Sequence, residues 1–313
     1  MISVPRPPKI HPALVLLALA VGGFAIGTTE FATMSLLRFF AHDLQIDEPT
    51  AGHVISAYAL GVVVGAPCIA VISARMSRRT LLMILMGVFA VANGASALAP
   101  SYHWMLFFRF ASGLPHGAYF GIAALVASSI VPADRRTQAV GRVLLGLTIA
   151  TIIGVPLANW LGQAVGWRWP FGVVALLALS CVVLVGIFAP RDPPRAGASP
   201  MAELGALARG QVWLTLLIGA IGFAIGTGGA LATVLQTRLM DVAGEHAQSL
   251  AASLNHSAFN IANALGPWLG GMVIAAGYGL TSTGWVGSGL ALAGLIVWSV
   301  SVTADRKSRL NNP

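Results

Sequence analysis

Nine long apolar runs follow one another along the 313 residues of this chain. Each run is long enough to cross about 30 Å of hydrocarbon as a helix, at about 1.5 Å per residue. Backbone polar groups inside a bilayer must be hydrogen-bonded internally, so continuous runs of this length predict helices. We therefore expect an all-α integral membrane protein, a helical bundle of about nine spans. The runs are 12–37, 51–74, 80–99, 104–131, 138–163, 170–189, 212–235, 251–275 and 282–302.

Charged residues make up only 9% of the chain, against about 25% in an average soluble domain. In a soluble protein, the formal net charge of +8 would suggest a nucleic-acid partner. Here the positive charge lies mostly in short loops between apolar runs, where it orients a membrane protein. We therefore expect the lipid bilayer as surroundings and no nucleic acid. The first run is about twice as long as the apolar region of a signal peptide, so we interpret it as a span.

The charges of the connecting segments alternate over the first six runs. The loop after the first run carries Asp43, Asp47 and Glu48, whereas basic residues precede the first run and follow the second, fourth and sixth. The positive-inside rule then places the N-terminus in the cytoplasm and predicts a multi-pass protein of the inner (plasma) membrane. The basic residues concerned are Arg6, Lys9, Arg75, Arg78, Arg79, Arg135, Arg136, Arg142, Arg191, Arg195 and Arg209.

The longest connecting segment, 190–210, is polar for this chain and holds four prolines, Pro190, Pro193, Pro194 and Pro200. Such a segment is typical of a linker rather than a span. We expect three parts: a six-helix bundle over 1–189, a cytoplasmic linker over 190–210, and a shortened bundle of about three spans over 211–313.

The number of spans conflicts with the charge of the C-terminus. Nine crossings from a cytoplasmic start would leave the basic tail, with Arg306, Lys307 and Arg309, outside. Either the run 212–235 does not cross fully, or the last two spans insert against the rule.

Several motifs follow one another in a family-like order. They are Gly27–Phe31, Ala57–Gly61 continuing to Pro67, Arg75–Arg79, Arg109–Gly117, and Gly154-Val155-Pro156 with Gly162. This order resembles the major facilitator superfamily, within it the bacterial drug:proton and sugar-efflux branch of arabinose-efflux-permease-like proteins. The resemblance implies two six-helix halves that exchange a solute for protons.

The second half resembles that family only in pieces. Trp213–Phe223 is similar to the start of span 7, Gln236–Met240 to the end of span 10, and Asn255–Gly271 to span 11. The resemblance implies an internal deletion of roughly three spans, joined near 222–227. Fusing an outward-going span to an inward-going one would also resolve the conflict over the C-terminus.

Glu30 and Arg109 are charged residues inside apolar runs, where an unpaired charge costs several kcal/mol. Glu30 is a candidate proton-coupling carboxylate, and the alternative is a carboxylate hydrogen-bonded near the outer headgroups. Arg109 is a candidate to promote release of that proton or to bind an anionic substrate. The alternative for Arg109 is snorkelling to the interface that Tyr102 and Trp104 mark.

Polar residues in the fourth and eighth runs are candidates for a substrate path. His116 lies two helical turns after Arg109, on a similar face. In the eighth run, His256, Asn260 and Asn263 share one stripe of an otherwise apolar helix, next to Asn255. The alternative is that His116, Asn255, His256, Asn260 and Asn263 only form hydrogen bonds between helices.

Two further groups carry a role by resemblance. Arg75, Arg78 and Arg79 correspond to the loop that latches the two halves of family members, although no carboxylate accompanies them locally and membrane orientation alone explains their charge. Gly146, Gly154, Pro156 and Gly162 correspond to the antiporter motif of span 5. Small residues of this kind let helices approach closely, and the proline bends the span.

The function that we expect is proton-coupled efflux of a small organic solute, such as a sugar, nucleoside or drug-like compound, by alternating access. The partners are then that solute, protons and lipid. The rival is a truncated relative that does not transport, or one that completes its bundle as a homodimer. We find no P-loop, catalytic carboxylate pair or metal-ligand spacing, so we expect no enzyme, cofactor or metal. Cys68 and Cys181 lie in apolar runs as small hydrophobic residues.

Overall fold

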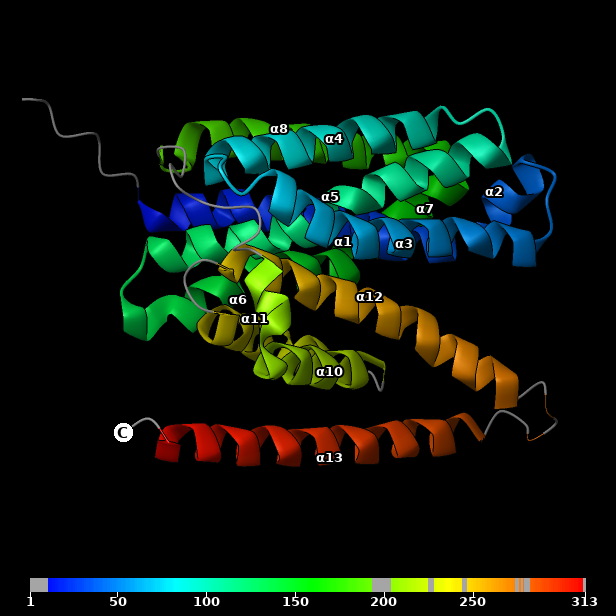
Figure 1. Ribbon diagram of the computed structural model, residues 1–313. Coiled ribbons are helices and arrows are strands. Elements are labelled where there is room, and N and C mark those ends of the chain that lie inside the picture. The colour runs from blue at the N-terminus through cyan, green and yellow to red at the C-terminus, as the bar shows by residue number, and fades with distance from the viewer. Residues whose placement is uncertain are drawn as a thin grey trace, which may run out of the picture.

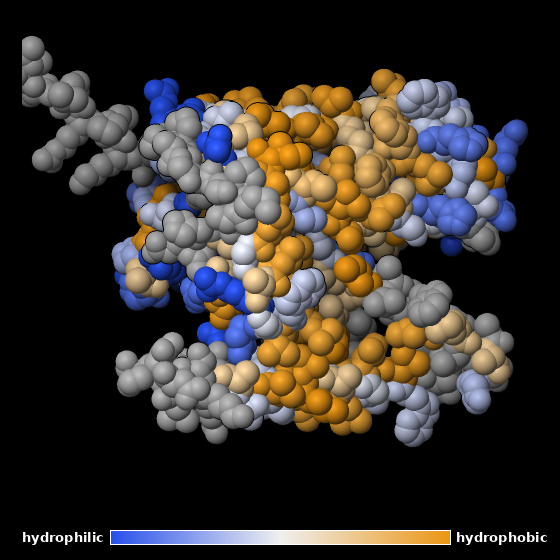
Figure 2. Space-filling model, viewed as in Figure 1, coloured by the Kyte–Doolittle hydropathy of each residue, from blue (hydrophilic) through white to orange (hydrophobic). Residues whose placement is uncertain are grey.

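The computed structural model describes residues 11–192, 204–224, 228–243, 247–273, 276, 278 and 282–311, and every regular element among them is helical. Seven of the described helical segments are long and apolar enough to span a bilayer. On the face drawn in Figure 2, apolar residues cover the middle of the molecule and hydrophilic residues lie toward its two ends. This distribution is that of a protein whose midsection contacts hydrocarbon.

The helices of the first half follow the predicted runs closely. They are α1 (Pro12–Ser35), α3 (Glu48–Ile72), α4 (Arg78–Ala97), α5 (Tyr102–Ser129) and α8 (Arg168–Phe188). Three of them begin at side-chain caps, since hydrogen bonds from backbone N–H groups are accepted by His11 (from Ala13, 3.3 Å), Asp47 (from Thr50, 3.0 Å) and Ser77 (from Thr80, 3.2 Å). A short helix, α2 (Leu37–Asp43), continues from α1 after a break at Leu36.

The fifth run is helical throughout but changes its winding. After the short 3₁₀ turn η1 (Ala133–Arg135), α6 (Arg136–Ile149) passes into a π-helical turn, η2 (Ala150–Gly154), and then into α7 (Val155–Val165). Pro156 stands at the start of α7, where its missing N–H cannot complete the regular ladder. A π turn accommodates that loss without ending the helix.

The run 212–235 is not the single span that the sequence predicts. After the 3₁₀ turn η3 (Gly205–Ala208), the structure divides the run between α10 (Gly210–Ala224) and α11 (Gly228–Ala243), of 15 and 16 residues, which pack against each other. Each would rise only about 23 Å, less than the thickness of the hydrocarbon. Glycines 228 and 229 begin α11, and residues of this type disfavour one continuous helix. The structure therefore favours the alternative of a run that does not cross fully.

The last two predicted spans are present as α12 (Gln248–Val273) and α13 (Ser282–Asn311). The polar residues of α12 lower its hydropathy, and α12 is not among the seven apolar segments. Figure 1 shows α12 slanting across the first-half helices and α13 lying outermost. The C-terminus lies at the same end of the molecule as the start of α1 (Figure 1), which agrees with a cytoplasmic location of the basic tail.

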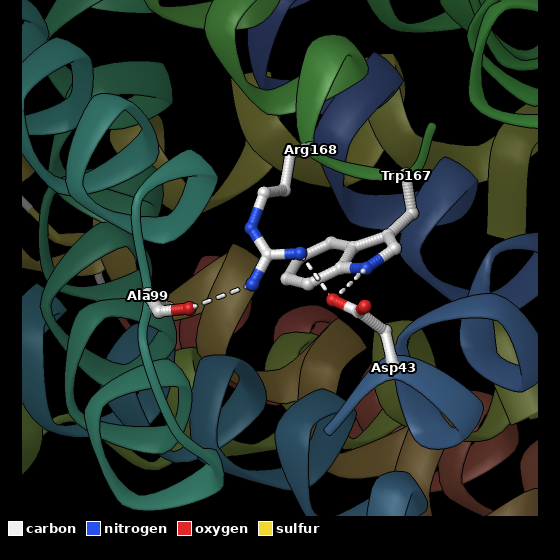
Figure 3. A network of polar contacts seen from close by, with 4 residues as sticks. All are labelled: Asp43, Ala99, Trp167 and Arg168. Atoms are coloured by element: carbon white, nitrogen blue, oxygen red, sulfur yellow. Dashed lines mark hydrogen bonds and ion pairs between the residues drawn. The ribbon is translucent and has the colours of Figure 1, made fainter. Parts of the chain in front are cut away.

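We name the two ends of the bundle by the charges of their loops. The cytoplasmic end holds the α3–α4 connection with Arg75, and the outer end holds α2. At the outer end, the Asp43 carboxylate accepts hydrogen bonds from Trp167 Nε1 at 3.0 Å and from Arg168 Nη1, while Arg168 Nη2 donates to the Ala99 carbonyl at 3.1 Å (Figure 3). This network joins α2 to the start of α8 and to the α4–α5 connection.

Candidate functional site

Glu30 lies inside α1 and is 8% exposed. Its carboxylate interacts electrostatically with the Arg109 guanidinium of α5, but no direct ion pair joins Glu30 to another described residue. Burial in the bundle argues against the alternative of a carboxylate at the outer headgroups. A buried carboxylate beside a buried cation is compensated while it is ionised, and protonation removes its own charge.

Arg109 is held by groups from three other helices. Its Nη1 donates to Thr29 Oγ1 at 3.1 Å, and Thr29 in turn donates to Asn93 Oδ1 at 2.9 Å. The guanidinium carbon lies 4.4 Å from the centroid of the Tyr58 ring and 5.6 Å from that of the Phe171 ring. Arg109 is only 1% exposed, so it does not reach an interface by snorkelling.

His116 and His256 form a contact between the two halves of the chain. Tyr58 Oη on α3 and His116 Nδ1 on α5 are hydrogen-bonded at 2.8 Å, and His116 Nε2 lies 3.3 Å from His256 Nδ1 on α12. The His256 ring also stacks on Phe120, with ring centroids 4.3 Å apart. Nε2 of His256 is buried and has no hydrogen-bond partner among the described residues.

Tyr58 is a member of this site that the sequence analysis did not single out. Tyr58 is 2% exposed and lies between Arg109 and His116. Its ring faces the Arg109 guanidinium, and its hydroxyl is hydrogen-bonded to the His116 imidazole. The available signal was a phenol within the otherwise apolar stretch Ala57–Gly61. A buried tyrosine in hydrocarbon needs a partner for its hydroxyl.

Next to the histidine pair, the backbones of α5 and α12 approach each other closely at Gly117 and Gly121. A Cβ at Gly121 would overlap Ser253 of α12, and one at Gly117 would press on the Ser253 carbonyl oxygen at 3.0 Å. Glycine at these two positions therefore allows α12 to approach α5 at backbone distance. Ser257 adds a hydrogen bond from its hydroxyl to the Val62 carbonyl of α3 at 3.3 Å.

The asparagines predicted for the substrate path separate in the structure. Asn255 Nδ2 donates to Gln236 Oε1 of α11 at 2.7 Å, so Asn255 joins α12 to α11 rather than to the histidine pair. Asn260 Nδ2 donates to the backbone carbonyl of His256 at 3.0 Å. The side chain of Asn263 lies outside the described residues. Hydrogen bonding between and within helices is thus the observed arrangement for Asn255 and Asn260.

The basic loop receives a carboxylate from a distant part of the chain. Asp192, which follows α8, accepts hydrogen bonds from the backbone N–H groups of Arg78 at 2.9 Å and Arg79 at 3.4 Å, and so caps α4. The Arg79 guanidinium also donates to the Gly186 carbonyl. The carboxylate missing from the local motif is therefore supplied after α8, whereas Arg75 is exposed.

The residues of the predicted antiporter motif lie against α1, the helix of Glu30. A Cβ at Gly146 would overlap the Ala20 carbonyl oxygen, and one at Gly154 would overlap the Thr28 hydroxyl. Gly162 lies equally close to Leu36, and Pro156 begins α7. The three glycine positions therefore let α6, η2 and α7 lie close to α1 and to Leu36, which directly follows it.

The described residues contain no group of three or more His, Cys, Asp or Glu side chains that could hold a metal ion. Cys181 is buried and its thiol donates to the Ala18 carbonyl at 3.4 Å, while Cys68 is exposed. The arrangement thus offers one carboxylate, one guanidinium, one phenol and two imidazoles within a helical bundle. Such groups move protons and bind polar solutes.

The family profile of the Major Facilitator Superfamily matches residues 19–224. The chain belongs to this superfamily of transporters and is a multi-pass protein of the inner membrane. The inner membrane transport protein YdhP of Escherichia coli (strain K12) is 34% identical over 379 aligned positions, which cover 93% of this chain and 96% of YdhP. This alignment is longer than the whole chain, so YdhP holds internal residues that this chain lacks.

A second relative and one solved structure agree with this assignment. The probable sugar efflux transporter of Mannheimia succiniciproducens is 32% identical over 204 residues, covering 65% of this chain and 51% of the relative. The structure of the proton:xylose symporter XylE superposes with a TM-score of 0.69 at 14% identity, covering 92% of this chain and 95% of XylE. The predicted resemblance to the sugar-efflux branch and the predicted fold are thus confirmed.

Proposed function

We propose that this chain is a secondary transporter that exchanges protons for a small organic solute in the direction of efflux. Burial of Glu30 next to Arg109 carries the proposal. A charged carboxylate inside the bundle is costly unless it is paired with a cation or neutralised by a proton, so a buried carboxylate of this kind is suited to taking up and releasing protons. The efflux direction follows the sugar-efflux relative. The division into a first bundle, a linker and a shortened second bundle remains part of the proposal.

In this mechanism Glu30 takes up a proton from the outer side and releases it to the cytoplasm. Arg109 favours the charged form of the carboxylate and so promotes release. Tyr58, His116 and His256 transmit the protonation state to α12, because the Arg109 guanidinium lies over the Tyr58 ring and hydrogen bonds join Tyr58 to His116 and His116 to His256. Rocking of α12 against α5 then exposes the site alternately to the two sides.

Proton release from everted vesicles tests the proposal. Vesicles are acidified inside by respiration, and L-arabinose or ethidium is added as the probe while acridine orange reports the gradient. The chain is expected to dissipate the gradient when it exchanges one of these probes, and Glu30→Gln is expected to abolish this response. Asp134→Asn, which changes an exposed carboxylate, is the control. Equal responses from Glu30→Gln and the unchanged chain would exclude Glu30 as the coupling group.

The rival proposal is a chain that does not transport on its own. Two observations favour it: α12 contacts α5 at backbone distance, and the chain lacks internal residues that YdhP holds. A second copy could then complete the bundle. Light scattering in a mild detergent separates the cases, because a homodimer gives twice the mass of the 32.3 kDa chain.

A further inference from the structure

A pocket lies at the outer end of the bundle, between the end of α1, α2 and α7. Arg38, Ser35 and Met34 line it from the α1–α2 side, and Asn159 and Gln163 line it from α7. Figure 1 places α2 and α7 at the end of the molecule opposite the C-terminus. The pocket is separate from Glu30 and Arg109, none of whose side chains line it.

Arg38 brings a positive charge to an end of the bundle whose loop is otherwise acidic. Its side chain is exposed and enters no ion pair among the described residues. The two described carboxylates nearby have other partners, because Asp43 accepts from Arg168 and Trp167, and Asp47 caps α3 through Thr50. A guanidinium without a carboxylate has five N–H donors that suit a phosphate group.

The α7 wall adds polar groups at the same depth. Gln163 Nε2 donates to Asn159 Oδ1 at 3.2 Å, and the two residues lie one turn apart on α7. This bond uses the Asn159 oxygen, so the two Asn159 amide N–H donors take no part in it. Arg38 and Asn159 therefore offer donors from two helices to one pocket.

The surface toward the bilayer centre is apolar and exposed. Met34 is 45% exposed and lies one turn before Arg38, and Pro156, three residues before Asn159 on α7, is exposed as well. α7 packs against α1, η2 and α8, all of the first half. Trp160, 64% exposed, is of the type that marks the headgroup region.

We propose that this pocket binds a phospholipid of the outer leaflet. Its phosphate lies against Arg38 and the Asn159 amide, and an acyl chain covers Met34 and Pro156. Donors at headgroup depth above exposed apolar side chains match an amphiphile with a phosphate head, whereas a free phosphate would gain nothing from the apolar part. The bound lipid contacts the side of α7 that faces away from its neighbours α1, η2 and α8.

Native mass spectrometry of the purified full chain tests this proposal, with phosphatidylglycerol titrated into the detergent solution. We expect one lipid to be retained, with about tenfold weaker binding for Arg38→Gln, equivalent to about 1.4 kcal/mol. Asn159→Asp is expected to weaken binding as well, because it places a negative charge beside the phosphate. Arg135→Gln, at an exposed arginine of the cytoplasmic end, is the matched control and is expected to bind normally.

Two competitors distinguish the possible ligands. Inorganic phosphate is expected to displace the lipid only at far higher concentration, and diacylglycerol, which lacks the phosphate, is expected not to compete. Displacement by inorganic phosphate at lipid-like concentrations would overturn the assignment to a phospholipid. Equal binding of diacylglycerol, or unchanged binding by Arg38→Gln, would also overturn it.

Discussion

Nε2 of His116 and Nδ1 of His256 lie 3.3 Å apart, although 140 residues separate them in sequence. Each ring belongs to a different half of the chain, and each is buried. Two neutral imidazoles can share one proton in such a contact, whereas two protonated rings would repel each other. The hydrogen bond between the two rings therefore forms only when at least one of them is neutral.

The first prediction concerns this pair. His256→Leu removes the partner of His116 Nε2 and the path to the second half, so we expect at least a tenfold loss of substrate-driven proton release (about 1.4 kcal/mol). His103→Ala, at an exposed histidine of the outer end, is the control and is expected to leave transport unchanged. Gel filtration verifies that both variants fold. Normal transport by a folded His256→Leu variant would leave the pair with a packing role only.

Arg109→Lys forms the second prediction. Lysine keeps the charge but loses the planar fork that bonds Thr29 and faces the Tyr58 and Phe171 rings. We expect proton exchange to fall by about tenfold or more, and Arg109→Ala to fold less stably because Thr29 loses its charged partner. Arg142→Lys, at an exposed arginine of α6, serves as the control. Full activity of Arg109→Lys would mean that charge alone suffices at this position.

Glycine at the α5–α12 contact gives the third prediction. Gly121→Leu forces α12 away from α5, because even a Cβ would overlap Ser253. Overpacking of this kind costs about 1–3 kcal/mol or more, so the midpoint of thermal unfolding is expected to fall by several degrees. Gly172→Leu on α8, where a Cβ meets no atom within 4 Å, is the matched control. Equal unfolding temperatures for the two variants would show that the α5–α12 contact is not rigid.

The fourth prediction concerns pH and Asp43. Hydrogen bonds from Arg168 and then Trp167 hold the pKa of the Asp43 carboxyl below its usual value of 3.8. A lowered pKa means that the unfolded chain takes up this proton first, so the stabilising effect is present above pH 3.8 and is lost as pH falls through the folded-state pKa. Asp43→Asn is therefore expected to destabilise the chain at neutral pH and to remove this part of the acid dependence. Thermal unfolding of both forms between pH 7 and about 3 measures it, and parallel curves would contradict it.

The sequence predicts the spanning helices well where hydrophobicity alone decides. Glu30 and Arg109 were predicted as candidates because charge in an apolar run is costly, and the structure buries both. Tyr58 and Asp192 were not predicted. The role of Tyr58 depends on how α3 packs against α5, and Asp192 lies 113 residues or more along the chain from Arg78 and Arg79, from whose backbone N–H groups it accepts hydrogen bonds at the start of α4. The division of 212–235 was missed because this apolar stretch, which takes in most of α10 and the first half of α11, has the length and hydropathy of one span.

The last prediction follows from that division. If α10 and α11 form a re-entrant pair that begins and ends at the cytoplasmic end, α12 crosses outward and α13 crosses back. The basic C-terminal tail then lies in the cytoplasm, as the positive-inside rule requires. A reporter that is active only in the cytoplasm is fused after Pro313, beside one that is active only outside. We expect only the first to be active. Activity of the second alone would mean that 212–235 crosses fully, that α12 and α13 are inverted, and that the proposal of a chain without transport gains the advantage.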